Sequence, residues 1–262
     1  MKFYLRSIIL YIKSRLEYRH FFWTSILSIF LLQFARFGLL WVILNRFKLI
    51  NGWNIYEVGF LFSLWLIAHG ITTIFFRQLW GFDRYVQRGE LDKYLLRPYS
   101  LLLQLSSSRL EPIGLGDLTP GIIIFIYSVN GLNIDFTFLK GLFLSSVILG
   151  AVLIETSIAL VVATLSFWLV KTRSLNLLFS ETEEHIIRYP ISIYSKPMIL
   201  IISFVIPIAF MNYFPSQVFL GRSDYIFSPA LGYMTPIVGI TLFLIALKFW
   251  NFGIRHYQST GS

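Results

Sequence analysis

Long uncharged stretches alternate with short charged ones along this chain. The stretch Val58–Phe76 runs for 19 residues without a charged side chain, and Gly141–Val170 carries Glu155 as its one charge in 30 residues. A helix needs about 20 mostly apolar residues to cross the hydrocarbon core of a bilayer. The pattern therefore predicts an all-α, polytopic membrane protein in which residues 1–262 form a single membrane domain.

Six transmembrane helices are predicted. A 30-residue fourth helix would be roughly 45 Å long, which exceeds a hydrocarbon core of about 30 Å, so it should tilt, break near Gly150 or project into water. Pro120 interrupts the third span, and Pro207 should kink the fifth. The predicted spans are about 21–44, 55–76, 118–129, 138–170, 197–214 and 228–247.

The first 20 residues have a different pattern. Apolar residues recur at helical spacing, and Lys and Arg side chains occupy the other positions. A helix with this pattern lies in the membrane interface rather than crossing it. Residues 1–20 are therefore predicted to form an amphipathic interfacial helix.

A dense polar segment separates the second and third spans. It runs from Gly81 to Pro98, GFDRYVQRGELDKYLLRP, and we call it the polar island. We expect a helix outside the membrane that ends at Arg97, because the residue before a proline is pushed out of helical geometry. Charged side chains would contact a polar partner, and Tyr85, Leu91, Tyr94 and Leu95 would form an apolar face for a partner groove. The alternative is an ordinary solvated loop with snorkelling arginines. The charged residues expected to make these contacts are Arg84, Arg88, Glu90, Asp92, Lys93 and Arg97.

Composition and charge agree with a membrane protein. Only 13% of residues are charged, about half of what soluble domains carry. The net charge of +9 comes mostly from side chains beside span ends, which indicates membrane lipids rather than nucleic acid as partners. The segments between the spans fall alternately on the two sides of the membrane. The N-terminal arm, residues 77–109, residues 171–196 and the C-terminal end share one side and carry seventeen Lys and Arg, whereas the loops on the other side carry three. Both termini are therefore predicted to be cytoplasmic.

No catalytic or cofactor-binding motif is found. The sequence has no GxxxxGK[ST] nucleotide loop, no GxSxG elbow and no HExxH spacing. The chain has no cysteine. The prediction is a non-enzymatic chain that itself binds no cofactor or metal. Its four histidines, His20, His69, His185 and His256, are scattered.

Two charged residues inside predicted spans are candidates for function. A carboxylate such as Glu155 in mid-span is costly and tends to face a protein interior or a water-filled path. Glu155 and Arg36 either line a substrate pathway or subunit interface, or pair with each other structurally. A third alternative for Glu155 is a position at a helix break near the lipid headgroups. A third alternative for Arg36 is a side chain that snorkels outward to the headgroups. His69 is predicted to be a hydrogen-bonded packing residue.

Three segments carry a resemblance to a known family. They are Arg88–Asp92 with Leu95–Pro98, Ile206–Gly221 (IPIAFMNYFPSQVFLG), and Trp250–Ser262 with its Gly, Arg, Tyr and Ser residues. Together with the six-span layout, they resemble the ABC-2-type permeases, in the subgroup of six-span exporter subunits.

The resemblance implies an exporter in a bacterial cytoplasmic membrane. Two permeases, identical or paralogous, would form the pathway, and two cytoplasmic ABC ATPase subunits would hold ATP and Mg. The polar island would be the coupling helix that contacts the ATPase. Its coupling residues would be Arg84, Tyr85, Arg88, Gly89, Glu90, Leu91, Asp92, Tyr94, Leu95, Arg97 and Pro98.

Two other classes compete with this interpretation. A secondary transporter usually carries several intramembrane ionisable groups and inverted repeats, and the predicted spans show little beyond Arg36 and Glu155. A membrane-embedded lipid-modifying enzyme would need clustered catalytic polar residues at the interface. Lipid-like, peptide and drug-like substrates suit the sequence equally.

Overall fold

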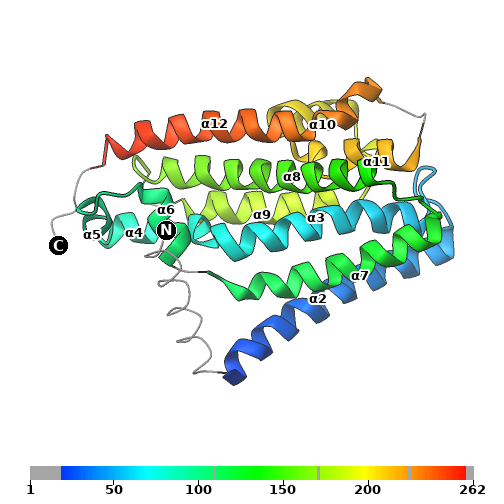
Figure 1. Cartoon of the computed structure of the whole chain (residues 1–262), viewed down its shortest axis with the longest axis horizontal. Helices are drawn as coiled ribbons and strands as arrows, with labels where there is room; N and C mark the ends of the chain where they lie inside the picture. Colours follow the sequence, from blue (N-terminus) through cyan, green and yellow to red (C-terminus); the bar gives the residue numbers. More distant parts are fainter. Residues whose placement is uncertain (1–18, 109, 170–171, 223–225, 258–262) are drawn as a thin grey trace.

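The structure is a computed structural model that describes residues 19–108, 110–169, 172–222 and 226–257. Long helices run side by side along the longest dimension of the molecule, with short helices near both ends (Figure 1). The predicted interfacial helix at 1–20 lies outside the described residues, apart from its last two. The α-helices are α2 (Arg19–Phe47), α3 (Ile55–Phe76), α4 (Asp83–Gln87), α5 (Asp92–Leu95), α6 (Leu101–Ser108), α7 (Leu115–Leu132), α8 (Phe138–Leu165), α9 (Arg173–Ile187), α10 (Lys196–Leu200), α11 (Tyr213–Leu220) and α12 (Thr235–Ile254).

The bundle has two chemically different ends. One end carries α4, α5, α6 and the last turn of α12, at the left of Figure 1. We call it the basic end, because exposed Arg77, Arg84, Arg88 and Arg173 lie there. The other end, called the far end, carries the α2–α3 loop and α11.

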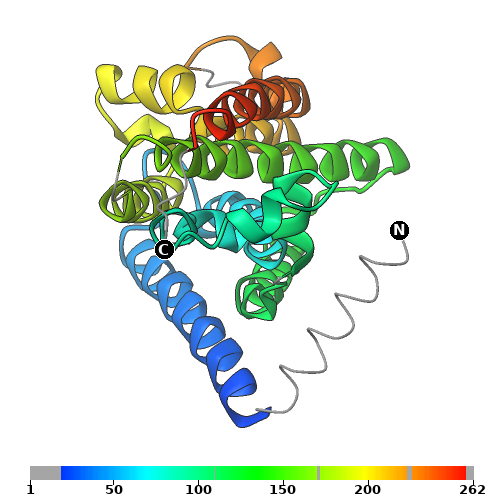
Figure 2. The same ribbon diagram turned by 90° about the vertical axis from the view of Figure 1, so that its left-hand side faces the viewer.

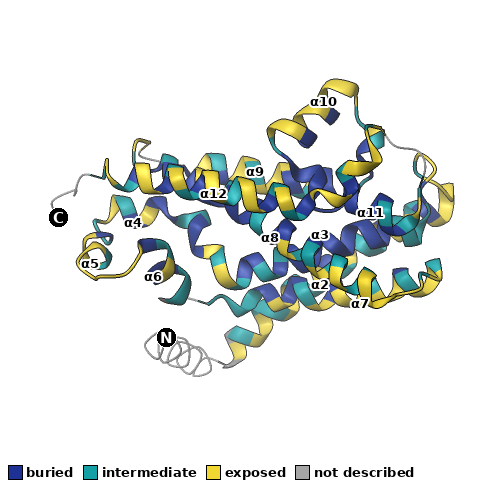
Figure 3. Cartoon of the chain, turned by 45° about the horizontal axis from the view of Figure 1, so that its top comes forward, coloured by how far each residue is buried: buried dark blue, intermediate teal, exposed yellow. Residues whose placement is uncertain are grey.

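Helix α3 is the centre of the bundle. It begins with a capping box in which the Asn54 side chain accepts from the Glu57 backbone N–H, while the Glu57 carboxylate accepts from the Asn54 N–H. Such a cap satisfies backbone donors at the start of a helix. Most of α3 is then buried by α7, α8 and α2 (Figure 3). Figure 2 shows that α2 splays away from the other helices at its Arg19 end.

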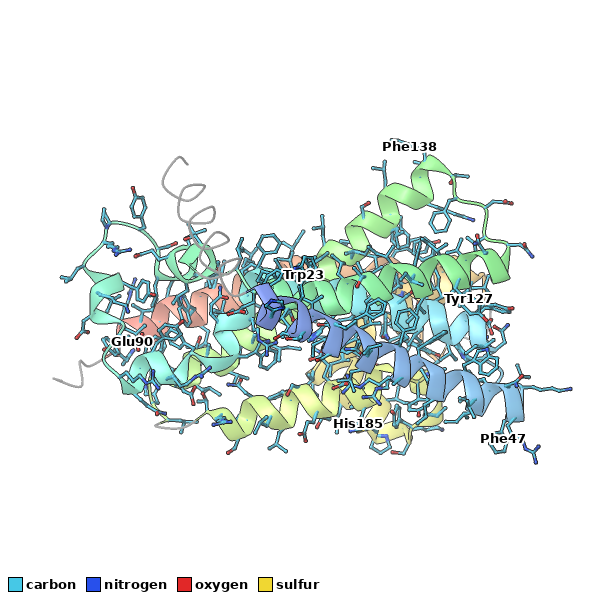
Figure 4. All side chains as sticks on the ribbon, turned by 90° about the horizontal axis from the view of Figure 1, so that it is seen from below. Trp23, Phe47, Glu90, Tyr127, Phe138 and His185 are labelled. Atoms are coloured by element: carbon cyan, nitrogen blue, oxygen red, sulfur yellow. The ribbon has the colours of Figure 1, made fainter. Side chains whose placement is uncertain are left out.

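Helices α8 and α12 pack against each other and run in the same direction. A Cβ atom on Gly239 would lie 2.5 Å from the Gly150 carbonyl oxygen, so these two glycines allow the backbones to touch. Helix α8 is continuous from Phe138 to Leu165. A break near Gly150, one of the three predicted alternatives, is therefore wrong. Phe138 projects beyond the bundle instead (Figure 4).

Among the described residues, five helices are long and apolar enough to cross a membrane, and the number rises to six if one bent helix pair counts as a span. The spans predicted at 21–44, 55–76, 118–129 and 138–170 correspond to α2, α3, α7 and α8. The last predicted span begins later than expected, at Thr235, because residues Pro229–Tyr233 form a 3-10 turn capped by Ser228.

The predicted fifth span, 197–214, is not a single helix. A π-helical turn at Ile201–Val205 and Pro207 separate two segments, Lys196–Val205 and Ile208–Leu220, whose axes differ by 74°. The bent pair starts and ends at the far end of the bundle. Just before it, the Ser192 carbonyl accepts from Asn51, and just after it Arg222 donates to the Gly52 carbonyl.

Helix α9 lies along α3 inside the bundle, although at 15 residues it is not among the helices long and apolar enough to cross a membrane. Asn176 at the start of α9 donates to the Trp80 carbonyl at the basic end. Further along α9, Glu183 accepts from Trp65 in the middle of α3. At the end of α9, the Asn212 side chain donates to the carbonyls of Ile187 and Leu61. These contacts place α9 antiparallel to α3 along most of its length. The prediction that 171–196 is a loop at the basic end is therefore wrong.

Candidate functional site

A cavity of about 560 Å³ lies between α2, α3, α9 and the polar island. It follows one face of α3, on which Trp65, His69, Thr73 and Arg77 recur every four residues. It therefore extends from the middle of the bundle to the basic end. Its buried side, called the inner wall, comprises Gln33, Trp65, His69, Asp117 and Glu183; the exposed side, called the mouth, comprises Arg77, Arg84, Arg88, Glu90 and Arg173.

Glu155 is fully buried directly behind the inner wall. Its Oε1 lies 2.6 Å from Nδ1 of His69, whose ring stacks on Trp65 with centroids 5.0 Å apart. Its Oε2 has no hydrogen-bond partner among the described residues. The predicted hydrogen bond of His69 is thus present, and it connects the buried carboxylate to the cavity.

Two further carboxylates form part of the inner wall. Asp117 accepts a hydrogen bond of 2.6 Å from the Gln33 side chain, and Glu183 accepts one of 3.1 Å from the Trp65 indole. Asp117 is 5% exposed and Glu183 is 4% exposed. Both are therefore held in place by neutral donors inside an apolar bundle, where an unpaired charge is costly.

Arg36 pairs with Glu184 rather than with Glu155. Arg188 also binds the same oxygen of Glu184, at 2.7 Å, and Arg36 donates to Gln33 as well. The predicted alternative of an Arg36–Glu155 pair is therefore wrong. The reason is α9: it brings Glu184 to Arg36 from a segment that the sequence assigned to a loop.

The polar island is two short helices rather than one. Helix α4 ends at Gln87, α5 starts at Asp92, and Gly89 between them has a φ of 63°, a left-handed conformation that suits glycine. Helix α5 ends at Leu95, two residues before the predicted end at Arg97. The segment predicted as a coupling helix is thus bent, and α4 with the following turn forms part of the mouth of the cavity.

The predicted apolar face of the island is divided. Tyr85 and Leu91 are 8% and 0% exposed and belong to a core that includes Trp250 of α12. They hold the island against the bundle and cannot contact a partner, contrary to the prediction. Leu95 and Leu96 point outward, with exposures of 43% and 87%.

Apart from buried Asp83, the charged island residues lie at least partly on the surface. Glu90 forms ion pairs with Arg88 at 3.8 Å and with Lys93 at 3.4 Å. Solvent-exposed pairs of this kind contribute little to stability. Asp92, Arg97 and Pro98 are exposed, and Tyr94 is half-buried.

Sequence reasoning missed most of the inner wall. Asp117 lies one residue before the predicted third span, and Glu183 and Glu184 fall in the supposed loop. A signal was present in α9, because Asn176, Glu183 and Ile187 share one helical face and all three are buried. No group of three or more His, Cys, Asp or Glu side chains is arranged to hold a metal ion in the part of the chain that the structure describes.

A bundle of long apolar helices enclosing a polar cavity defines a multi-pass membrane transport protein. The chain belongs to the ABC-2 transporter family: the family profile described as "ABC-2 family transporter protein" matches residues 30–261. Searches of curated proteins and of solved structures gave no match. Family membership identifies the chain as a permease of an ABC transporter, a membrane component that associates with an ABC ATPase.

Proposed function

We propose that the chain is the pathway-forming permease of an ATP-driven exporter in a bacterial cytoplasmic membrane, with no catalytic activity of its own. Two ABC ATPase subunits, which hold ATP and Mg, would bind at the basic end, and a second permease, identical or paralogous, would complete the pathway. One observation carries the proposal: Arg84, Arg88 and Glu90 belong both to the polar island and to the mouth of the cavity. A partner that moves the island would therefore reshape the entrance to a polar path.

This arrangement supports coupling through the island. Its first half is packed into the bundle core by Tyr85 and Leu91, while its second half presents Leu95 and Leu96 to the outside. A force applied at α5 would reach α8 and α12 through that core. The proposed ATPase contact is therefore α5 with Leu96, Arg97 and Pro98.

A test of the function compares ATP turnover with and without the partner. The purified chain should hydrolyse no ATP, and an ATPase that contains a GxxxxGK[ST] loop should co-purify with it from its own membranes. ATP added to inside-out vesicles should drive substrate into them. ATP-independent transport that stops when an ion gradient is collapsed would contradict the proposal.

That outcome would favour a secondary transporter, and one observation supports keeping it as the second candidate. His69, Asp117, Glu155 and Glu183 lie together inside the bundle, whereas the sequence alone indicated few intramembrane ionisable groups. Groups of this kind are typical of ion-coupled transport.

We also propose that α9 makes the fifth membrane crossing, so that the bent pair enters and leaves the membrane at the outer face. Arg188 is half-buried at the end of α9, and Lys196 lies at the far end. The remaining described Lys and Arg side chains outside the spans are still more numerous at the basic end. The positive-inside rule therefore makes the basic end cytoplasmic.

Single cysteines test this topology cleanly, because the chain has none of its own. Ser195→Cys should react with a membrane-impermeant maleimide in intact cells, as should Asn51→Cys. Ser174→Cys should react only after permeabilisation. All three positions are exposed. Equal protection of Ser174→Cys and Ser195→Cys would place both residues on the cytoplasmic side and contradict a crossing by α9.

A further inference from the structure

The cavity-facing carboxylates of the inner wall are not matched by cations. Neither Asp117 nor Glu183 forms an ion pair within the part of the chain that the structure describes, and each has a neutral donor instead. Both line the cavity and are more than nine-tenths buried. Burying an ionised carboxylate without a positive partner costs several kcal/mol. The inner wall therefore favours a positive group that enters the cavity.

The positive side chains closest to the inner wall are engaged with other carboxylates, except Arg77, which attracts Asp117 from the exposed side of the cavity without forming an ion pair among the described residues. Arg36 and Arg188 share Glu184, and His69 is bonded to Glu155. The second carboxylate oxygen of Glu155 is buried without a partner among the described residues. Asp117 and Glu183 are thus left without a cation in hydrogen-bonding contact among the described residues.

Trp65 adds a second recognition element at the same place. Its indole lines the cavity, donates to Glu183 and stacks on His69. An aromatic face attracts organic cations, more strongly where water is excluded. Carboxylates can accept charge-assisted hydrogen bonds from an ammonium or a guanidinium, and the neighbouring indole can attract the same cation.

We propose that the inner wall binds the cationic group of a small organic substrate, an ammonium, amidinium or guanidinium, while the rest of the molecule fills the cavity. The volume of about 560 Å³ lies within the range of sites for drug-sized molecules. The inference rests on the proposed function, since it assumes that the cavity is part of the transport path.

The arginines of the mouth do not contradict this assignment. Arg77, Arg84, Arg88 and Arg173 are exposed at the basic end, whereas Asp117 and Glu183 are buried deeper along α3. Salt and water screen exposed charges far more than buried ones. Selectivity is therefore set at the inner wall.

The test measures binding of benzamidinium to the full chain in phosphatidylcholine nanodiscs by titration calorimetry, without ATP. Benzamide, which has nearly the same shape and no charge, and benzoate, which is an anion, are the matched probes. Benzamidinium should bind at least about tenfold more tightly than either, as expected for charge-assisted hydrogen bonds in a buried site. Equal binding of benzamide, or a preference for benzoate, would overturn the proposal.

Glu183→Gln and Asp117→Asn should each weaken benzamidinium binding at least about tenfold and leave benzamide binding unchanged. Glu181→Gln is the matched control, because Glu181 is exposed on the same helix and does not line the cavity. Glu183→Asp keeps the charge and should retain more affinity than Glu183→Gln, which separates charge from folding. Displacement of benzamidinium by micromolar Mn²⁺ would indicate a metal site and overturn the assignment to an organic cation.

Failure of this experiment is distinguishable from failure of the proposed function. If benzamidinium does not bind while the ATPase still co-purifies and turns over ATP, the substrate class is wrong and the permease assignment stands. If benzamidinium binds and no ATPase associates, the cavity is a cation site in a transporter of another kind.

Discussion

Replacing Leu95 and Leu96 with Asp should release the ABC ATPase from the permease while leaving the permease folded. Leu96 is 87% exposed and Leu95 is 43% exposed, so neither contributes much to the core of the chain. Unpaired charges introduced into a protein contact commonly cost several kcal/mol. The measurement is the amount of ATPase that co-purifies from membranes and the ATP turnover of the preparation, and both should fall at least about tenfold.

The control is Leu49→Asp, an exposed leucine in the α2–α3 loop at the far end, with 54% exposure. It adds one Asp to a loop at the opposite end of the bundle and should leave the complex intact. Leu91→Asp is expected to fail differently, with loss of folded protein, because Leu91 is completely buried. A Leu95→Asp/Leu96→Asp permease that keeps its ATPase and full turnover would show that the contact lies elsewhere.

This choice of residues differs from the one that the sequence favours. Reversing Glu90 and Asp92 to Lys is a less direct test of the island, because Glu90 is paired with Arg88 and Lys93 inside the chain and borders the cavity. Its reversal would change the mouth and the partner contact together. The leucines separate these two effects.

Long apolar helices could be predicted from the sequence because a run of about 20 apolar residues is visible in the composition alone. The predicted 55–76 coincides with α3, whose capping residue Asn54 and continuous apolar run are both visible in the sequence. Helix α9 could not be found in that way. Its buried face includes Asn176 and Glu183, which lower the average hydropathy, and its place beside α3 depends on tertiary hydrogen bonds.

The island shows a second limit of the sequence. Tyr85, Leu91, Tyr94 and Leu95 are all apolar or aromatic, and spacing cannot tell which of them face the protein's own core. Gly89 settles the matter by turning the chain, so that Leu91 packs inward with α12 and Leu95 faces outward. The polar segment could be delimited from the sequence, whereas the orientation of its side chains required the structure.

Glu155 and His69 should behave as one unit in a double-mutant cycle. His69→Leu should lower the melting temperature, because an apolar side chain cannot donate to the fully buried Glu155, which then loses its 2.6 Å partner. Glu155→Gln should lower it less, since an amide can still bond to the imidazole. The double variant should regain part of the loss, with a coupling energy of about 0.5–3 kcal/mol. The His69 side chain is 29% exposed, which favours the lower half of that range.

The matching cycle of Arg36→Gln with Glu155→Gln is the control, and it should be additive within about 0.5 kcal/mol. Arg36 is bound to Glu184 and Gln33, so losing Glu155 removes none of its bonds. Both cycles are measured as unfolding free energies in one detergent. A large coupling between Arg36 and Glu155, together with additivity between His69 and Glu155, would show that Arg36 pairs with Glu155. That result would contradict the position of α9. The reverse result would support it, because α9 is what brings Glu184 to Arg36 and leaves Glu155 to His69.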